Sequence, residues 1–293
     1  MLHRKASPDT DLSEHDYRIG QHRILVGDCL VWLDEIAADS VDVIVTSPPY
    51  NVGVRYNSYR DTAPRRDYLA WFGSVAEKLH RVLKPDGSFF LNIGGTNSDP
   101  WGPMEIAFQL RDLFVLQNHI TWVKSISIGE TTHGHFKPVN SKRYLNHTHE
   151  TLFHFTRSGE VLLDRLAVGV PFQHKSNIAR RGHAQDLRCA GNTWFLPYKT
   201  IQRKAEKFDH PASFPVELPE RCIKLHGGGD LTVLDPFLGT GSTLIACARI
   251  GTIGIGIELD PDYASRAAER LVAALNADPA ETEADGANTM SAV

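Results

Sequence analysis

Apolar and polar residues follow one another along this chain in blocks that predict alternating strands and helices. The β-branched run at 41–45 stops at two prolines, which is typical of a buried strand that opens into a tight turn. Residues 67–82 carry apolar side chains at the spacing of an amphipathic helix. The same alternation predicts further strands within 24–27, 88–95, 114–124, 149–157, 231–235 and 252–260, and further helices within 31–40, 104–113, 215–227, 242–251 and 262–275.

Strands that are continuous apolar runs and that alternate with helices predict a parallel sheet covered on both faces. We therefore expect an α/β fold with a doubly wound, mostly parallel sheet. Four segments show neither the helical nor the strand spacing of apolar residues. The rest of the chain is expected to form one domain in two halves, at 18–156 and 210–275. The aperiodic segments are a loose N-terminal arm at 1–17, a mobile loop at 51–66, an inserted region at 157–209 and an acidic, disordered tail at 276–293.

Three of the predicted strands end in distinctive polar turns. These turns lie at 27–28, at 46–50 and at 235–239. In open α/β sheets, ligands bind beyond the carboxyl ends of the strands. The sequence therefore predicts that the three turns meet in one site.

The turn that begins at Asp235 has the features of a cofactor-binding turn. Gly239 and Gly241, before Ser242, let the backbone turn sharply and approach a ligand. The spacing matches neither GxGxxG nor a Walker loop, and an acid at Asp235 would repel a phosphate but suits an ammonium group. Glu258 ends the next strand about twenty residues later, where an acid can accept hydrogen bonds from ribose hydroxyls.

The turn Ser47-Pro48-Pro49-Tyr50 is the most specific feature of the chain. An amino group on a nucleobase is a poor nucleophile, so a site that methylates it should accept hydrogen bonds from its N–H groups. Ser47 offers a hydroxyl and Pro48 a carbonyl, whose direction the prolines fix. Tyr50 offers a ring on which a base can stack, a contact worth roughly 1–3 kcal/mol.

Charge places a basic segment inside an acidic chain. The 293 residues carry a net charge of −4, but 157–209 holds ten Lys or Arg against five Asp or Glu. Such a region is typical of a face that binds a polyanion. Cys29, Cys189, Cys222 and Cys247 show no metal-ligand spacing, so we expect no metal. No apolar run spans a membrane and no secretory signal is evident, so we expect a cytoplasmic protein.

Together these residues resemble the DNA amino-methyltransferases, which make N4-methylcytosine or N6-methyladenine. Residues 47–50 match the family's (D/N/S)PP(Y/F) catalytic motif, and 235–241 match its S-adenosylmethionine motif. Residues 210–215 resemble the segment beside the methionine end of the cofactor, and Asp28 resembles the acid near the adenine end. Residues 146–150 fit a later motif. Because the catalytic turn precedes the cofactor turn, the order resembles the β-type arrangement.

The resemblance covers roughly 18–275 and implies a Rossmann-like methyltransferase fold with S-adenosyl-L-methionine as cofactor. It implies double-stranded DNA as substrate, flipping of the target base, and 157–209 as the target-recognition region. A homodimer and a cognate restriction endonuclease are further partners that it suggests. The expected catalytic residues are Ser47, Pro48, Pro49 and Tyr50; the cofactor-binding residues are Asp28, Ser213, Phe214, Asp235, Pro236, Phe237, Gly239, Gly241, Ser242 and Glu258; the DNA-binding residues are Arg180, Arg181, Gln185, Arg188, Lys199 and Arg203.

The target base stays open between cytosine N4 and adenine N6. Ser47 in place of Asp resembles the cytosine enzymes, whereas Asn51 recurs in adenine enzymes. An RNA or protein amide methyltransferase also uses a PPY turn, but it places the cofactor turn first and lacks the basic insert. A non-enzymatic nucleic-acid-binding module would need the basic segment without the two strand-end turns.

Overall fold

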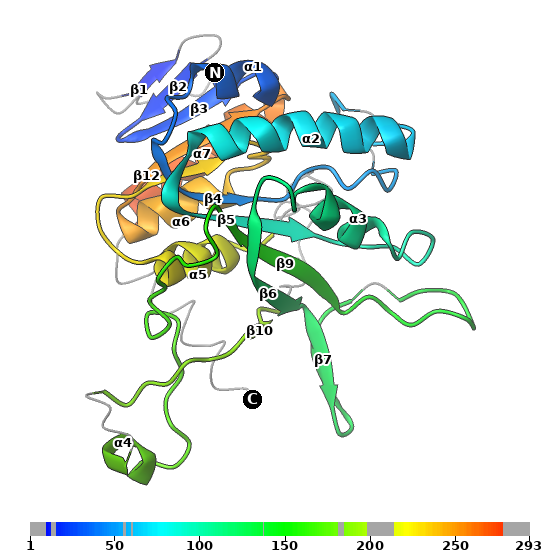
Figure 1. Ribbon diagram of the computed structural model, residues 1–293, viewed down its shortest axis with the longest axis vertical. Coiled ribbons are helices and arrows are strands. Elements are labelled where there is room, and N and C mark those ends of the chain that lie inside the picture. Colours follow the sequence, from blue (N-terminus) through cyan, green and yellow to red (C-terminus); the bar gives the residue numbers. More distant parts are fainter. Residues whose placement is uncertain are drawn as a thin grey trace.

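A mostly parallel β-sheet forms the centre of the molecule, and helices cover both of its faces (Figure 1). The computed structural model describes residues 10–12, 16–54, 57–59, 61–136, 138–180, 185–197 and 214–277. Within them, ten strands join in the order β1-β2-β3-β12-β11-β4-β5-β9-β6-β10. The strands are β1 (Thr10–Leu12), β2 (Asp16–Ile19), β3 (His22–Val26), β4 (Val41–Thr46), β5 (Leu83–Ile93), β6 (Val115–Val123), β7 (Ser125–Ile128), β8 (Thr131–Gly134), β9 (His149–Thr156), β10 (Thr193–Phe195), β11 (Thr232–Asp235) and β12 (Ile253–Glu258). The helices are α1 (Cys29–Glu35), α2 (Arg65–Val82), α3 (Gly102–Gln109), α4 (Ser176–Arg180), α5 (Glu217–His226), α6 (Ser242–Ile250) and α7 (Pro261–Asn276).

Strands β3, β12, β11, β4 and β5 run parallel to one another, so their carboxyl ends share one edge of the sheet. We call this the catalytic edge. It carries all three polar turns, because β3, β4 and β11 end there. The doubly wound, mostly parallel α/β fold that the apolar blocks predict is confirmed.

Strand β4 shows how one sheet serves two layers of helices. Successive side chains of a strand point to opposite faces. Ile44 accordingly packs in the layer of α1 and α2, with Phe72 of α2. Val43 and Val45 pack in the opposite layer, with Ile223 of α5. A strand buried on both faces needs no polar alternation, and this explains the continuous β-branched run.

One antiparallel strand changes what reaches the catalytic edge. β9 lies between β5 and β6 and runs antiparallel to both. Its first residues therefore lie where β5 and β6 end, and His149 pairs with Val123. β7 and β8 continue from β6 as a separate hairpin that projects from the body of the sheet (Figure 1).

Part of the region at 157–209, which we expected to be an aperiodic insert, belongs to the main sheet. Its strand β10 pairs parallel with β6 and extends the main sheet. Trp194 of β10 is buried with Trp122 of β6, whose indole N–H donates to the Leu196 carbonyl at 2.9 Å. The three-residue strand is too short to show a period, but two tryptophans fix it on the sheet.

The expectation of a loose arm at 1–17 is wrong for its described part. β1 and β2 form an antiparallel pair that continues the sheet beyond β3. Asp16 accepts from Arg23 at 2.8 Å, and Ile19 is buried against α7 residues. Most of the tail, at 278–293, lies outside the described residues. No helix in the described ranges is long and apolar enough to cross a membrane.

Candidate active site

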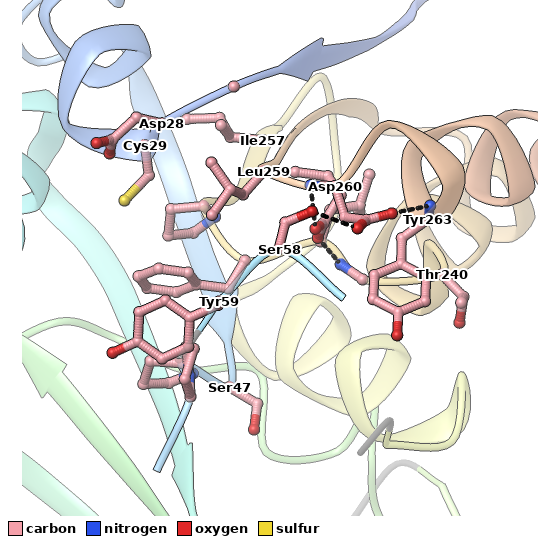
Figure 2. Close-up of a pocket in the computed structure, with 18 of the residues that line it drawn as sticks. Asp28, Cys29, Ser47, Ser58, Tyr59, Thr240, Ile257, Leu259, Asp260 and Tyr263 are labelled. Carbon is pink, nitrogen blue, oxygen red and sulfur yellow. Dashed lines mark hydrogen bonds between the residues drawn. The ribbon is translucent and has the colours of Figure 1, made fainter. Parts of the chain in front are cut away.

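The three polar turns of the catalytic edge line one cavity (Figure 2). Asp28 follows β3, the Ser47 turn follows β4, and the glycine turn follows β11. Glu258 lines the cavity from the end of β12. The sequence-predicted residues that line it are Asp28, Ser47, Pro48, Pro49, Tyr50, Phe214, Pro236, Phe237, Gly239, Ser242 and Glu258.

Hydrogen bonds hold the catalytic turn from both of its sides. Ser47 Oγ lies 2.6 Å from the Tyr50 hydroxyl, and Tyr68 of α2 donates to the Pro49 carbonyl at 2.7 Å. Asn51 takes the left-handed backbone conformation with φ of 57°, which Asn tolerates better than most residues. The turn therefore presents Ser47 and Tyr50 to the cavity on a fixed backbone.

The loop after the catalytic turn is anchored by a buried carboxylate. Asp61 accepts hydrogen bonds from the backbone N–H groups of Asn51, Val52 and Val54 at 2.7–3.0 Å. Its own carbonyl accepts from Gly53 at 2.8 Å. We expected a mobile loop at 51–66, but these four bonds fix its first residues against Asp61. An isolated acid among polar residues gave no sign of this role.

Glu258 ties the end of β12 to the glycine turn. One carboxylate oxygen accepts from Gly239 N–H at 2.7 Å, and the other accepts from Asp260 N–H at 2.9 Å. Burial raises the pKa of Glu258 to about 7, with the two backbone bonds acting in the opposite direction. Each carboxylate oxygen has a second lone pair, so Glu258 can still accept a bond from a ligand in the cavity.

Asp235 does not line the cavity, although we expected it to face a cationic ligand. It is 1% exposed, and both of its oxygens are used inside the protein. Thr46 and Thr243 donate to them at 2.7 and 2.6 Å, and Phe237 N–H donates at 3.1 Å. Asp235 therefore holds the cofactor turn to the end of β4 and to α6.

Gly241 also lies behind the cavity wall and not on it. It has a φ of 89°, and a Cβ there would lie 3.0 Å from the Cβ of Ala267 in α7. A glycine is required because the turn is left-handed and the two helices pack closely. The second glycine of the turn thus serves the packing of α6 against α7.

Three further predicted cofactor residues, Asp28, Phe214 and Ser242, have clear placements. Asp28 caps α1 by accepting from Leu30 N–H at 2.9 Å, and its exposed side chain borders the cavity. The Phe214 carbonyl accepts from Ser242 Oγ at 2.9 Å, which joins the segment before α5 to the start of α6. Ser213 lies outside the described residues.

Several cavity residues were missed because they belong to segments without a recognisable motif. Ser58 donates to Asp260 at 2.6 Å, so the loop after the catalytic turn reaches across the cavity to the start of α7 (Figure 2). Tyr59 and Trp71 add aromatic surface, with ring centroids 5.9 Å apart. The available signal was Asp260 before Pro261, a helix-start pattern that predicts a cap but no site.

The predicted DNA-binding residues that the structure describes are exposed and stand apart from the cavity. Arg180 ends α4, which lies away from the sheet (Figure 1). Gln185 and Arg188 follow, and the backbone of Arg188 pairs with Val170. Arg181, Lys199 and Arg203 lie outside the described residues. Within the described ranges, no three His, Cys, Asp or Glu side chains gather as a metal site would require.

The raised pKa of Glu258 predicts a pH-dependent cost to stability. The native carboxyl titrates at about 7 and the unfolded one near its ordinary value of 4.5, so the native state binds more protons between these values. The free energy of unfolding contributed by Glu258 therefore falls as pH rises from about 4.5 to about 7, by on the order of 3 kcal/mol. Buried His22 and His154, whose pKa values are lowered by burial, act in the opposite direction.

Because the histidines oppose Glu258, its contribution is measured as the difference in unfolding free energy between the wild type and a Glu258 variant. Urea unfolding of the wild type and of Glu258→Gln across this pH range should show the wild type losing stability relative to the variant as pH rises. A difference that stays constant with pH would contradict the assignment.

Comparison with known proteins identifies the family. The family model described as DNA methylase, of the N6 and N4 methyltransferases, matches residues 41–269. The Type II methyltransferase M.BglII of Bacillus subtilis is 28% identical over 256 residues, which cover 83% of this chain and 66% of that enzyme. The DNA adenine methyltransferase YhdJ of Escherichia coli (strain K12) is 27% identical, covering 85% of this chain and 82% of YhdJ.

A solved structure shares the fold. The PvuII DNA methyltransferase, described as cytosine-N4-specific, superposes with a TM-score of 0.66 at 21% identity, covering 87% of this chain and 91% of that one. The family match spans the catalytic turn, the cofactor turn and the strands that carry them. The chain therefore belongs to the DNA methylase family of N6 and N4 amino-methyltransferases.

Proposed function

We propose that this protein transfers a methyl group from S-adenosyl-L-methionine to the exocyclic amino group of a flipped base in double-stranded DNA. The observation that carries the proposal is that the catalytic turn and the cofactor turn share one cavity. Ser47 and Tyr50 line one part of this cavity, and the strand-end acids Asp28 and Glu258 line another. The methyl-accepting base and the methyl donor would therefore lie in the same cavity.

The cofactor part of the cavity fits a nucleoside joined to a cationic amino acid. Asp28 and Glu258 are carboxylates at the ends of neighbouring strands, and they are suited to accept from amino and hydroxyl groups. Phe237, Ile257 and Phe214 supply apolar walls. When bound, the cofactor supplies a methyl group on a positively charged sulfur. Asp235 supports this site through the turn and makes no contact with the cavity itself.

The catalytic part holds and activates the amino group. Ser47 Oγ and the Pro48 carbonyl accept its two N–H bonds, which directs the nitrogen lone pair away from the turn and toward the methyl donor. The Tyr50 ring lines the cavity as a stacking surface for the base. Trp71 and Phe237, whose ring centroids lie 5.6 Å apart, keep water from the reacting groups.

Cytosine N4 and adenine N6 are both compatible with this arrangement, and we propose cytosine on the strength of Ser47. One experiment decides between them. DNA of varied sequence is incubated with the protein and labelled S-adenosyl-L-methionine, digested to nucleosides and analysed by mass spectrometry. N4-methylcytosine supports the proposal and N6-methyladenine replaces it with the alternative. Label in RNA or protein alone would overturn DNA methylation.

The role of Ser47 is tested by removing its hydroxyl. Ser47→Ala removes one of two acceptors for the amino group, so single-turnover methylation should fall about 100-fold or more while cofactor affinity stays unchanged. The matched control is Ser40→Ala at the opposite end of β4, whose hydroxyl donates to the Ala37 carbonyl and does not line the cavity. Equal rates for Ser47→Ala and the control would show that Ser47 does not bind the amino group of the target base.

We propose that DNA lies across the catalytic edge and that the region at 157–209 contacts it away from the cavity, through Arg180, Gln185 and Arg188. Arg181, Lys199 and Arg203, which lie outside the described residues, belong to the same proposal. The segment at 125–148, between β6 and β9, also belongs to this face, because both of its ends lie on the edge. It carries three Lys or Arg against one acid. Arg143 stacks over Tyr144 at 5.1 Å, and Leu145 is 89% exposed. Such residues suit a phosphate backbone and an opened base stack.

Replacing both Lys142 and Arg143 by Ala should therefore weaken binding to duplexes of any sequence. The slope of log affinity against log salt should become shallower by about one for each lost phosphate contact. The control is Lys224→Ala, an exposed lysine of α5. Affinity and salt slope that match the control would remove this segment from the DNA-binding face.

We further propose that the protein forms a homodimer through α3. Trp101, Met104 and Phe108 recur at helical spacing and are 69%, 46% and 65% exposed. A row of large apolar side chains left in water is typical of a surface that binds another protein, and a second copy offers the same row.

Because M.BglII is named a Type II methyltransferase, we also propose a companion restriction endonuclease, in the cytoplasm with the DNA.

The dimer is tested by a charge placed in this row. Phe108→Glu should convert a dimer into a monomer in light scattering, because the new carboxylate would be buried without a partner. Gln109→Glu is the control, since it adds the same charge to the same helix at an exposed polar position. A wild-type protein that is monomeric at every concentration would refute the dimer.

A further inference from the structure

A line of hydrogen bonds leads from the cavity into the protein behind Ser47. Ser47 Oγ lies 2.6 Å from the Tyr50 hydroxyl, and the Tyr50 hydroxyl donates to Glu150 Oε2 at 3.2 Å. Ser47 and Tyr50 line the cavity, whereas Glu150 does not. The line therefore connects the surface that meets the target base to a carboxylate outside the cavity.

The other neighbours of Glu150 show that it serves as an acceptor. Asn92 Nδ2 donates to Glu150 Oε2 at 2.7 Å and to the Tyr50 hydroxyl at 2.8 Å. Lys124 Nζ donates to Glu150 Oε1 at 2.7 Å. All three partners present protons to this carboxylate. Lys124 is the charged group that faces it, at ion-pair distance.

These contacts assign the direction of each hydrogen bond. The Tyr50 hydroxyl donates to the Glu150 carboxylate, so the Tyr50 proton lies between Tyr50 and Glu150. Tyr50 has a single proton, so Ser47 must be the donor in the short bond to Tyr50. The lone pairs of Ser47 Oγ are then left for other donors. This is the orientation that a group accepting from a substrate N–H requires.

Close packing fixes the same arrangement. A Cβ built at Gly94, just past β5, would lie 2.9 Å from the Tyr50 ring and 3.2 Å from the Glu150 carboxyl carbon. Glu150 reaches this place because β9 runs antiparallel and begins at the catalytic edge. A strand parallel to its neighbours would place its first residues at the opposite edge.

We propose that Glu150 is a positioning residue that orients Ser47 through Tyr50 and receives the proton released by methylation. This rests on the proposed role of Ser47. The amino nitrogen forms a bond to the methyl carbon as the carbon–sulfur bond breaks, and the bonding electrons go to sulfur. The nitrogen, now positively charged, gives a proton to Ser47 Oγ while Ser47 gives its own to Tyr50 and Tyr50 gives its own to Glu150. Sulfur loses its positive charge, and the Glu150 carboxylate becomes a neutral carboxylic acid by taking up the proton.

The transfer to Glu150 needs no strong base. A methylated nucleobase nitrogen that still bears two hydrogens is a strong acid, because losing a proton restores the delocalisation of its lone pair into the ring. A weak base suffices as the final acceptor. The relay also removes the proton without opening the cavity to water, which a directly exposed base would require.

Two variants separate the steps of the relay. Glu150→Gln keeps the shape and an oxygen for Tyr50 but cannot take a proton, and Tyr50→Phe keeps the ring but removes the hydroxyl. Each should lower single-turnover methylation by about tenfold or more, with affinities for cofactor and DNA unchanged. The double variant should be no slower than Tyr50→Phe, because both changes interrupt one relay. Glu160→Gln, at an exposed glutamate beyond the other end of β9, is the matched control.

A spectroscopic measurement without cofactor or DNA tests the hydrogen bonds directly. With 3-fluorotyrosine at position 50, the ¹⁹F resonance should shift in Glu150→Gln and in Ser47→Ala but not in Glu160→Gln. Wild-type turnover in Glu150→Gln, or losses that multiply in the double variant, would overturn the relay. A fall in thermal stability together with weaker binding would also overturn it, because that reduces Glu150 to a structural residue. If Ser47→Ala is inactive while Glu150→Gln is normal, the proposed function stands and only the relay fails.

Discussion

The site depends on the buried carboxylate of Asp235. It joins Thr46 at the end of β4, the N–H of Phe237 in the cofactor turn, and Thr243 in α6. Burial raises the pKa of Asp235 to about 6, against the lowering effect of these three hydrogen bonds, because an ionised acid is costly to keep in the core. The hydrogen bonds from the two threonines and the turn offset that cost only when β4, β11 and α6 are all in place. Catalytic and cofactor turns are thus fixed relative to each other.

The antiparallel strand β9 brings its first residues to the catalytic edge, beside the carboxyl ends of the parallel strands. Parallel strands alone deliver only their carboxyl ends to the catalytic edge, and here these carry the turns that line the cavity. β9 delivers the start of a strand instead, and with it Glu150 and the ion pair to Lys124. Groups behind the cavity can then act on groups that line it. The same geometry keeps the ends of the 125–148 segment beside the site.

Sequence reasoning succeeded where one residue type answers one local requirement. The run at 41–45 had to be a strand buried on both faces, and two prolines had to end it. It failed where a residue's role depends on a distant partner. Asp235 was assigned to a ligand because its acid stands in a glycine turn, but Thr46, 189 residues earlier, uses one of its oxygens. Ser58 and Asp260, which line the cavity and are joined by a hydrogen bond, are separated by 202 residues and share no motif.

The sequence by itself determined the alternation of strands and helices, the family motifs and their order, and the residues of the catalytic turn. These follow from local periodicity and from residues whose backbone freedom is special, and both act within a few positions along the chain. Only the tertiary structure decided which acids face the cavity, what supports Ser47, and that β10 belongs to the sheet. These depend on contacts between elements far apart in the chain, where burial and hydrogen-bond partners are set by packing.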